Sequence, residues 1–192
     1  VTAERVEGRA GGWEGLTATE AESIQEGANM LLTFKNIQNE GGKTGGIFDQ
    51  TVVAATDMAR AMGTDVKSAS MMLGKALNDP ATGLSKLSRA GVTFTEQQQE
   101  QIKAMANAGD TAGAQALMLA ELNAQFGGSG EAYASTYAGQ MELVGHAVGA
   151  LGETIMQAAM PALLWLAENG AKAFNWLAEN QAVLGVVAGV IG

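Results

Sequence analysis

The chain has 192 residues, no cysteine and a formal net charge of -9. The length is sufficient for a domain with a hydrophobic core. The lack of cysteine excludes a disulfide framework, thiol catalysis and a cysteine-ligated metal. The acidic balance, without a cluster of Lys and Arg, argues against specific nucleic-acid binding. Because the chain starts at Val1 and stops at Gly192 inside an apolar run, we expect it to be an internal part of a longer protein.

Residues 1–16 are glycine-dotted and polar, which predicts an irregular lead-in with Trp13 as its one anchor. Thr17 and Glu20 have the spacing of a capping box, in which each side chain satisfies a backbone N–H group at a helix start. We therefore predict a helix over 18–38. Its apolar positions recur at steps of three and four and predict one buried face: Ala21, Ile24, Ala28, Leu31 and Leu32.

A glycine-rich loop over 41–46 follows and contains Gly42, Lys43 and Thr44, the last three residues of the phosphate-binding P-loop pattern. The pattern also needs a glycine five positions before Gly42 and a preceding buried strand. That position is Ile37, and the preceding segment is a predicted helix. We interpret the loop as a flexible linker.

Short helices separated by turn signals are predicted from Ile47 to Phe126. Gly63 ends the first of them, Thr64 or Asp65 caps the next, and Asn78-Asp79-Pro80 makes a turn. Two later helices also have a start signal. Thr95 and Gln98 form a capping box at the start of the first, and Asp110 caps the second. The predicted helices cover 47–62, 66–77, 81–90, 96–108 and 111–126.

Gly127 to Gly130 form the second linker, where we place the main boundary. No turn signal interrupts 132–160, which predicts one long helix. Glu131, Glu142 and Glu153 are eleven residues apart, and the sequence Trp-Leu-Ala-Glu-Asn recurs at 165 and 176. Eleven residues make about three helical turns, so the repeat favours a straight or right-handed association of helices. The alternative is chance in an Ala- and Glu-rich sequence.

Pro161 either kinks this helix or begins a new one. Residues 182–192 are apolar and uncharged. They are too few to span a bilayer, which takes roughly 20 residues. They are either the opening of a transmembrane helix, with Trp165 and Trp176 near the interface, or part of a buried core helix.

No residue pattern indicates a catalytic, cofactor-binding or metal site. His146 is the only histidine, and Glu142 is the sole acid one helical turn away, so we predict a solvated helix residue. Glu153 and Glu168 are too isolated to form a carboxylate pair. Acids from Glu121 to Glu153 are expected to keep one helix face hydrated. The methionines at 58, 62, 71 and 72 form either an adaptable contact surface or core filling.

Two blocks of sequence stand out, Lys75 to Pro80 (KALNDP) and Gly91 to Gln97 (GVTFTEQ). Both resemble segments of tail tape-measure proteins of long-tailed phages and prophages. The flanking segments Leu31 to Ile37 (LLTFKNI) and Ala120 to Gly128 (AELNAQFGG) resemble the same family in the same order. The resemblance covers about 17–166.

The resemblance implies a structural protein and no enzyme. Such a protein lies in the lumen of the tail tube, sets tail length during assembly in the host cytoplasm, and is ejected at infection to help DNA cross the host membrane. The implied partners are the tail tube protein, tail-tip or baseplate proteins, tail assembly chaperones, further copies of the chain and the host inner membrane. The alternative is a membrane-perturbing helical effector or pore-forming protein outside a tail.

We thus expect an all-α fold, in which a cluster of short capped helices precedes a long Gly/Ala-rich helix and an apolar C-terminal segment. The expected parts are the lead-in 1–16, a helical cluster 17–128, a long helical segment 129–181 and an apolar start 182–192. A pure ruler should be one unbroken coiled coil, whereas 17–126 is broken by turns. Our hypothesis is that this part is a compact module beside a membrane-active region, with tail length set mostly elsewhere.

Overall fold

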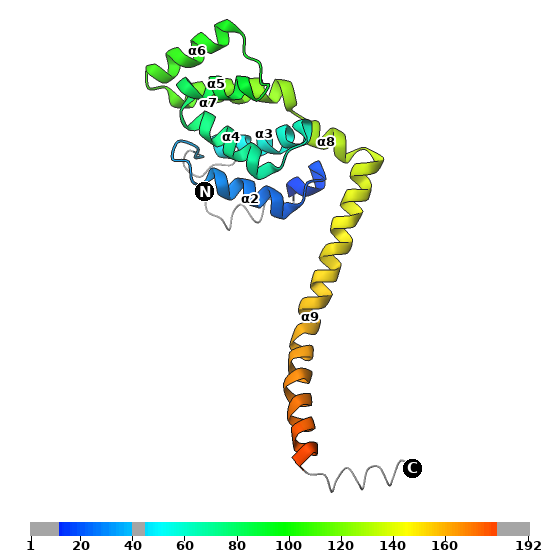
Figure 1. Cartoon of the computed structure of the whole chain (residues 1–192). Helices are drawn as coiled ribbons and strands as arrows, with labels where there is room; N and C mark the ends of the chain where they lie inside the picture. The colour runs from blue at the N-terminus through cyan, green and yellow to red at the C-terminus, as the bar shows by residue number, and fades with distance from the viewer. Residues whose placement is uncertain (1–11, 40–44, 180–192) are drawn as a thin grey trace. The chain divides into compact units, whose positions relative to one another are not determined.

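The computed structural model describes residues 12–39 and 45–179, and the regular elements in this part of the chain are α-helices (Figure 1). A helical segment over 12–17 comes first. The elements after it are α2 (Ala21–Leu31), α3 (Ile47–Met62), α4 (Val66–Asn78), α5 (Pro80–Arg89), α6 (Glu96–Asn107), α7 (Thr111–Phe126), α8 (Ser129–Ala134) and α9 (Tyr137–Glu179). The all-α prediction is confirmed, with a cluster of short helices followed by a long one. The apolar segment 182–192 lies outside the described residues.

The chain divides into two compact units, the first ending at Val144 and the second beginning at Gly145. In the first unit, α4 packs against α2, α3 and α5, while α3 also contacts α7 and α8 (Figure 1). One continuous core joins these helices. Its largest fully buried side chains include Ile24, Leu31, Phe48, Met58, Leu73, Leu77, Leu87, Ile102, Met118 and Leu122.

The predicted helix ends inside the cluster are confirmed because their signals are local. Gly63 adopts a left-handed conformation, with φ of 65°, and ends α3. The Asp65 carboxylate accepts a hydrogen bond of 2.7 Å from the Ser68 backbone N–H at the start of α4. Thr95 and Gln98 form the complete capping box of α6. Asp110 caps α7 in the same manner as Asp65 caps α4.

Two glycines allow close contacts between neighbouring elements. The ring of Phe34 lies against Gly74 of α4, where a Cβ atom would overlap it. Gly83 of α5 lies against the backbone of Ala76 in α4, so a Cβ there would collide with main-chain atoms. The two helices are joined by a single residue, Asp79. The short connection is thus possible because α5 carries no side chain at this point.

A buried glutamine joins three parts of the cluster. Gln115 of α7 is 2% exposed, and its Nε2 group donates hydrogen bonds to the backbone oxygens of Asn36, at 2.7 Å, and Leu77, at 2.9 Å. Leu77 lies in the last turn of α4, where carbonyl groups have no partner within the helix. The side chain of Gln115 therefore satisfies a helix end and fixes the loop after α2.

The predicted helix over 18–38 is wrong at both ends. Thr17 ends the helical segment 12–17, and its hydroxyl donates to the Trp13 backbone oxygen at 2.9 Å instead of capping α2. Ala18 follows with a φ of 50°, so the helix cannot begin there. At the other end, α2 stops at Leu31 and the chain turns so that Phe34 reaches Gly74. The lead-in 1–16 is likewise helical from residue 12 onward.

The linker predicted at 127–130 is not a boundary. α8 begins at Ser129 and packs on α3, and the backbone N–H groups of Gly128 and Gly130 bond to Asp57 of α3. The single helix predicted over 132–160 is also wrong, because α8 ends at Ala134 and α9 starts at Tyr137. The Thr136 hydroxyl accepts a hydrogen bond from the Gly139 N–H at 3.1 Å, which caps the new start. Pro161 lies inside α9 and does not end it.

We predict that Gly83→Ala destabilises the cluster by about 3 kcal/mol or more, since the added methyl group forces α4 and α5 apart. Urea unfolding of the full chain measures this. Ser88→Ala, on the exposed side of α5, adds no contact and should change stability by less than about 0.5 kcal/mol. Equal stability of the two variants would show that α5 does not lie against α4 in this way.

A second prediction concerns acid unfolding. The hydrogen bonds from Ser68 lower the pKa of Asp65 below its ordinary value of 3.8. The resulting stabilisation is present above pH 3.8 and is lost as pH falls through the pKa of the folded state. The loss of stability in Asp65→Ala should therefore be constant above about pH 5 and shrink below pH 3.8. Thr95→Ala removes an uncharged cap, and its cost should not follow pH; the same pH dependence in both variants would contradict the assignment.

Candidate functional site

The large apolar side chains along α9 are exposed. The exposed fractions lie between 42% and 67% for Val144, Val148, Leu151, Ile155, Met156, Met160, Leu163, Leu164, Trp165 and Leu166. Glycines at 145, 149 and 152 alternate with these apolar residues in the sequence, and from Ala158 to Ala167 no residue carries a charge. A contiguous exposed apolar surface of this kind marks a site of contact with protein or membrane.

Among the described residues, one helical stretch is long and apolar enough to cross a bilayer: Tyr137–Gly170, in which an 18-residue window reaches a mean hydropathy of 1.3. This criterion tests only the length and the amino-acid composition of the helix. The stretch contains three charged residues, Glu142, Glu153 and Glu168. The sequence left residues 182–192 as either the opening of a transmembrane helix or part of a buried core helix, and these residues lie outside the described part of the chain. The stretch Tyr137–Gly170 precedes them in the chain.

Arg60 holds the first turns of α9 within the first unit. Its Nη2 donates to the Ala18 backbone oxygen at 2.9 Å, and the same atom lies 3.4 Å from Glu142 Oε1 of α9. The guanidinium group stacks 4.0 Å from the centre of the Tyr133 ring. The Tyr133 hydroxyl donates to Glu142 Oε2 at 2.8 Å. This set of contacts connects α3, α8 and α9.

The same contacts perturb the titration of Tyr133. Its hydrogen bond to Glu142 raises the pKa of Tyr133 above 10.0, with burial and the Glu142 charge acting in the same direction and Arg60 against them. The neutral phenol is therefore the form that supports the contact with α9. Glu142, which the sequence predicted to hydrate a helix face, is instead used to hold α9 to the cluster.

Asp57 makes the second attachment. Asp57 is only 5% exposed. Its two carboxylate oxygens accept hydrogen bonds from the backbone N–H groups of Gly128, at 3.1 Å, and Gly130, at 2.9 Å. A carboxylate at this position also matches the partial positive charge of a helix N-terminus. Asp57 thereby fixes the loop between α7 and α8, and with it the direction in which the chain leaves α7.

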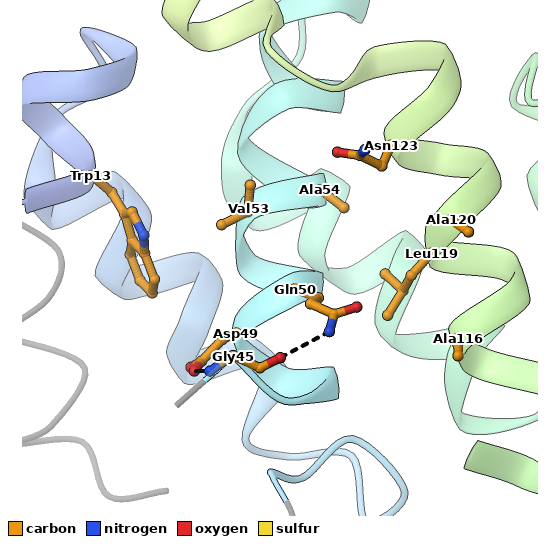
Figure 2. Close-up of a pocket in the computed structure, with 10 residues that line it drawn as sticks. All are labelled: Trp13, Gly45, Asp49, Gln50, Val53, Ala54, Ala116, Leu119, Ala120 and Asn123. Atoms are coloured by element: carbon orange, nitrogen blue, oxygen red, sulfur yellow. Dashed lines mark hydrogen bonds between the residues drawn. The ribbon is translucent and has the colours of Figure 1, made fainter. Parts of the chain in front are cut away.

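A pocket of about 450 Å³ lies between Trp13 and the helices α3 and α7 (Figure 2). Its lining is mostly apolar. The Asp49 carboxylate accepts from the Gly45 N–H at 2.6 Å, and Gln50 Nε2 donates to the Gly45 oxygen at 2.8 Å, so both side chains hold the start of α3. The lining residues are Trp13, Gly45, Asp49, Gln50, Val53, Ala54, Ala116, Leu119, Ala120 and Asn123. We interpret the pocket as a gap in packing beside Trp13, whose side chain is partly buried against the core.

The structure separates the other residues that the sequence singled out. His146 is half-buried on α9, and no group of three or more potential metal ligands occurs in the described part of the chain. Met58 is in the core, whereas Met62 is 40% exposed and Met71 is 36% exposed. Most of the glycine-rich loop, residues 40–44, is outside the described residues.

The acids predicted to hydrate one helix face have different environments. Glu121 accepts hydrogen bonds from Gln98 Nε2 and Gln125 Nε2, at 2.5 and 2.6 Å, so it joins α6 to α7. Glu153 is exposed on α9 and accepts from Gln157 Nε2 at 3.0 Å. The prediction is therefore wrong for Glu121 and Glu142, which make contacts within the cluster.

Sequence reasoning missed Asp57 and Arg60. Asp57 bonds to residues 71 and 73 positions later, and Arg60 to residues 42 positions earlier and 82 later. No short-range spacing signals contacts of that separation. A buried helix with an Asp and an Arg three positions apart was the only hint, since charged groups are rarely buried without a partner.

No protein-family model, curated protein or solved structure matches this chain. The resemblance to tape-measure proteins thus rests on the quoted segments alone. The function that this resemblance implies is therefore a proposal.

We predict that Asp57→Ala lowers the free energy of unfolding by roughly 2–4 kcal/mol, because the buried Gly130 N–H loses its charged partner. Urea unfolding measures the loss, and limited proteolysis should show new cleavage within 127–136. Asp57→Asn keeps one acceptor oxygen and should lie between the native chain and Asp57→Ala. Native stability of Asp57→Ala would contradict the role given to Asp57.

Proposed function

We propose that this chain belongs to a phage tail tape-measure protein. Two features support the proposal together: the ordered segments that resemble the family, and a compact helical cluster followed by a long exposed helix. The observation that carries most weight is α9, which has 43 residues and therefore a length of about 65 Å at 1.5 Å per residue. Its exposed apolar side chains need an enclosing partner.

In this role the protein lies in the lumen of the tail tube during assembly. The exposed apolar residues of α9 contact further copies of the chain, the tube wall or tail-tip proteins, and assembly chaperones cover them beforehand. At infection the chain leaves the tube ahead of the genome, and Tyr137–Gly170 enters the host inner membrane. The function needs no catalytic residue, cofactor or metal, and we propose none.

The two units contribute differently to such a role. The cluster folds back on itself through contacts such as α4 with α5 and α3 with α7, so it adds little length per residue. α9 is unbroken and adds about 1.5 Å per residue. We therefore extend the sequence-based hypothesis: the cluster is a compact module, and α9 contributes its own length to the ruler while most of the length is set outside this chain.

Deleting 145–166 in frame from the parent gene removes 22 residues, two of the eleven-residue units. We predict virion tails shorter by about 33 Å, the helical rise of the lost residues. Electron microscopy of the tails measures the change. Starting the deletion at Gly145 leaves the contacts of Arg60, Tyr133 and Glu142 intact.

The matched control replaces 145–166 with a polar Ala/Glu/Lys helix of the same 22 residues. Tail length should return to normal, while delivery of DNA into the host should fail because the apolar segment is lost. Normal tail length and normal DNA delivery in both variants would contradict the proposed function.

A membrane-perturbing helical effector outside a tail is the second candidate, and the apolar stretch Tyr137–Gly170 favours it. Leakage of dye from liposomes separates the two candidates. Leakage caused by the chain alone, without any tail and at nanomolar concentration, would favour the effector over the tail protein.

A further inference from the structure

The turn between α8 and α9 contains no residue that forces it. α8 ends at Ala134 and α9 starts at Tyr137. The sequence over 131–138 has neither glycine nor proline, the residues that most often interrupt helices. Neither Ser135 nor Thr136 has a positive φ, so the turn needs no special backbone conformation. The local sequence is therefore equally suited to one helix that continues from α8 into α9.

Side chains replace hydrogen bonds that the turn interrupts. In an unbroken helix, the backbone N–H groups of residues 137–139 would bond to the carbonyl groups four residues earlier. In the turn, the Thr136 hydroxyl accepts a hydrogen bond from the Gly139 N–H at 3.1 Å. Gln140 Nε2 donates to the Ala134 backbone oxygen at 2.7 Å. Because these side chains recover part of the lost bonding, the bent form is close in free energy to an unbroken helix.

One hydrogen bond across the turn can form only in the bent form. The Tyr133 hydroxyl donates to Glu142 Oε2 at 2.8 Å. In an unbroken helix these residues, nine positions apart, would lie on opposite sides and about 13.5 Å apart along the axis. Arg60 of α3 also supports the bend, since its Nη2 atom lies 3.4 Å from Glu142 Oε1 and its guanidinium group lies 4.0 Å from the centre of the Tyr133 ring. Contacts between elements, and not the local sequence, hold the turn.

Gly139 is suited to the bent form alone. A Cβ atom at this position would overlap the backbone oxygen of Tyr133 and lie 2.8 Å from the Cα atom of Ala134. In an unbroken helix, residues five and six positions apart do not approach so closely, so an added methyl group would be tolerated. Gly145, six residues further along α9, has open space at its Cβ position. The size of the side chain at residue 139 therefore distinguishes the two forms.

We propose that residues 135–139 are a two-state hinge. Contacts of Glu142 with Tyr133 and Arg60 hold the bent form, and release of these contacts lets α8 and α9 join into one helix. A partner that binds the unbroken form better than the bent form shifts the hinge toward the unbroken form. Binding along α9 is thereby coupled to the contacts of Arg60. The hinge requires no tail, so it is tested on the purified chain, and its failure would leave the tail-length experiment unaffected.

The distance between two spin labels measures the state of the hinge. The native chain lacks cysteine, so Met62→Cys and Val144→Cys introduce the only labelling sites. The two native residues are 40% and 52% exposed. In the bent form Arg60, two residues before the first label, contacts Glu142, two residues before the second. Joining of the helices separates these groups, and the distance between the labels should increase on the order of 10 Å. Double electron–electron resonance measures both populations.

Three variants of the labelled chain test the contacts. The native sequence should give mainly the short distance. Glu142→Ala removes the contacts with Tyr133 and Arg60 and should raise the ratio of long to short distances on the order of tenfold. Gly139→Ala disfavours the bent form by overlap and should raise the ratio at least as much. Gly145→Ala is the matched control, since it adds the same methyl group away from the turn, and should change the ratio less than about twofold.

A proline variant tests the joining of the two helices. Tyr137 is the first residue of α9 and is 81% exposed, so Tyr137→Pro removes no packing from the cluster. Proline is accepted at a helix start, but within an unbroken helix it lacks the N–H group and clashes with the preceding turn. Adding Tyr137→Pro to Glu142→Ala should therefore abolish the population at the long distance.

Three results would overturn the proposal. The first is an unchanged distance in both Glu142→Ala and Gly139→Ala, which would indicate a fixed turn. The second is an equal shift in Gly145→Ala, which would indicate a general effect on the helix. The third is a long-distance population that survives Tyr137→Pro, because the helices would then move apart without joining. Circular dichroism checks the folding of each variant. If Gly139→Ala does not fold, Glu142→Ala decides alone, since the Glu142 side chain is 33% exposed and lies outside the core.

Discussion

The exposed apolar side chains of α9 impose the constraint on which the rest of the interpretation depends. Leaving apolar surface in water costs about 25 cal/mol per Å² relative to burying it. An isolated helix also gains little stability from its own hydrogen bonds. Val148, Leu151 and Ile155 are each more than half exposed, so α9 requires a second surface. A second copy of the helix, a tail tube and a bilayer all supply one, and the proposed function uses each at a different stage.

The helical cluster has the opposite property, because it buries its own core and pairs several buried polar side chains within one chain. Gln115 is an example, since its amide serves two backbone oxygens from different helices. Asp57 and Arg60 lie one helical turn apart on α3. Their contacts join α3 to α8 and to the first turns of α9. These contacts reach the first turns of α9, and the large apolar side chains further along α9 are exposed. No chemistry at a catalytic site is needed for such a division of roles.

Much of the cluster could be predicted from sequence because its helix ends are marked locally. Gly63, the pair of Thr95 and Gln98, and Asp110 each act within four residues of their partners. Thr17 carries the same kind of signal, but it does not cap the helix that follows, because its hydroxyl donates to the backbone oxygen of Trp13. The contacts of Asp57 and Arg60 join residues far apart in the sequence, so no periodic sequence pattern predicts them. Along α9, the apolar residues and the eleven-residue repeat are visible in the sequence, whereas the exposure of the apolar side chains is known only from the structure.

The most direct measurement is amide hydrogen exchange along the full chain at rising protein concentration. We predict that protection of α2 to α7 does not depend on concentration, because the core of the cluster lies within one chain. Protection of 145–166 should increase with concentration, because further copies of the chain then cover the exposed apolar side chains of α9. Strong protection of 145–166 at the lowest concentration, unchanged on raising it, would contradict the claim that α9 needs a second surface.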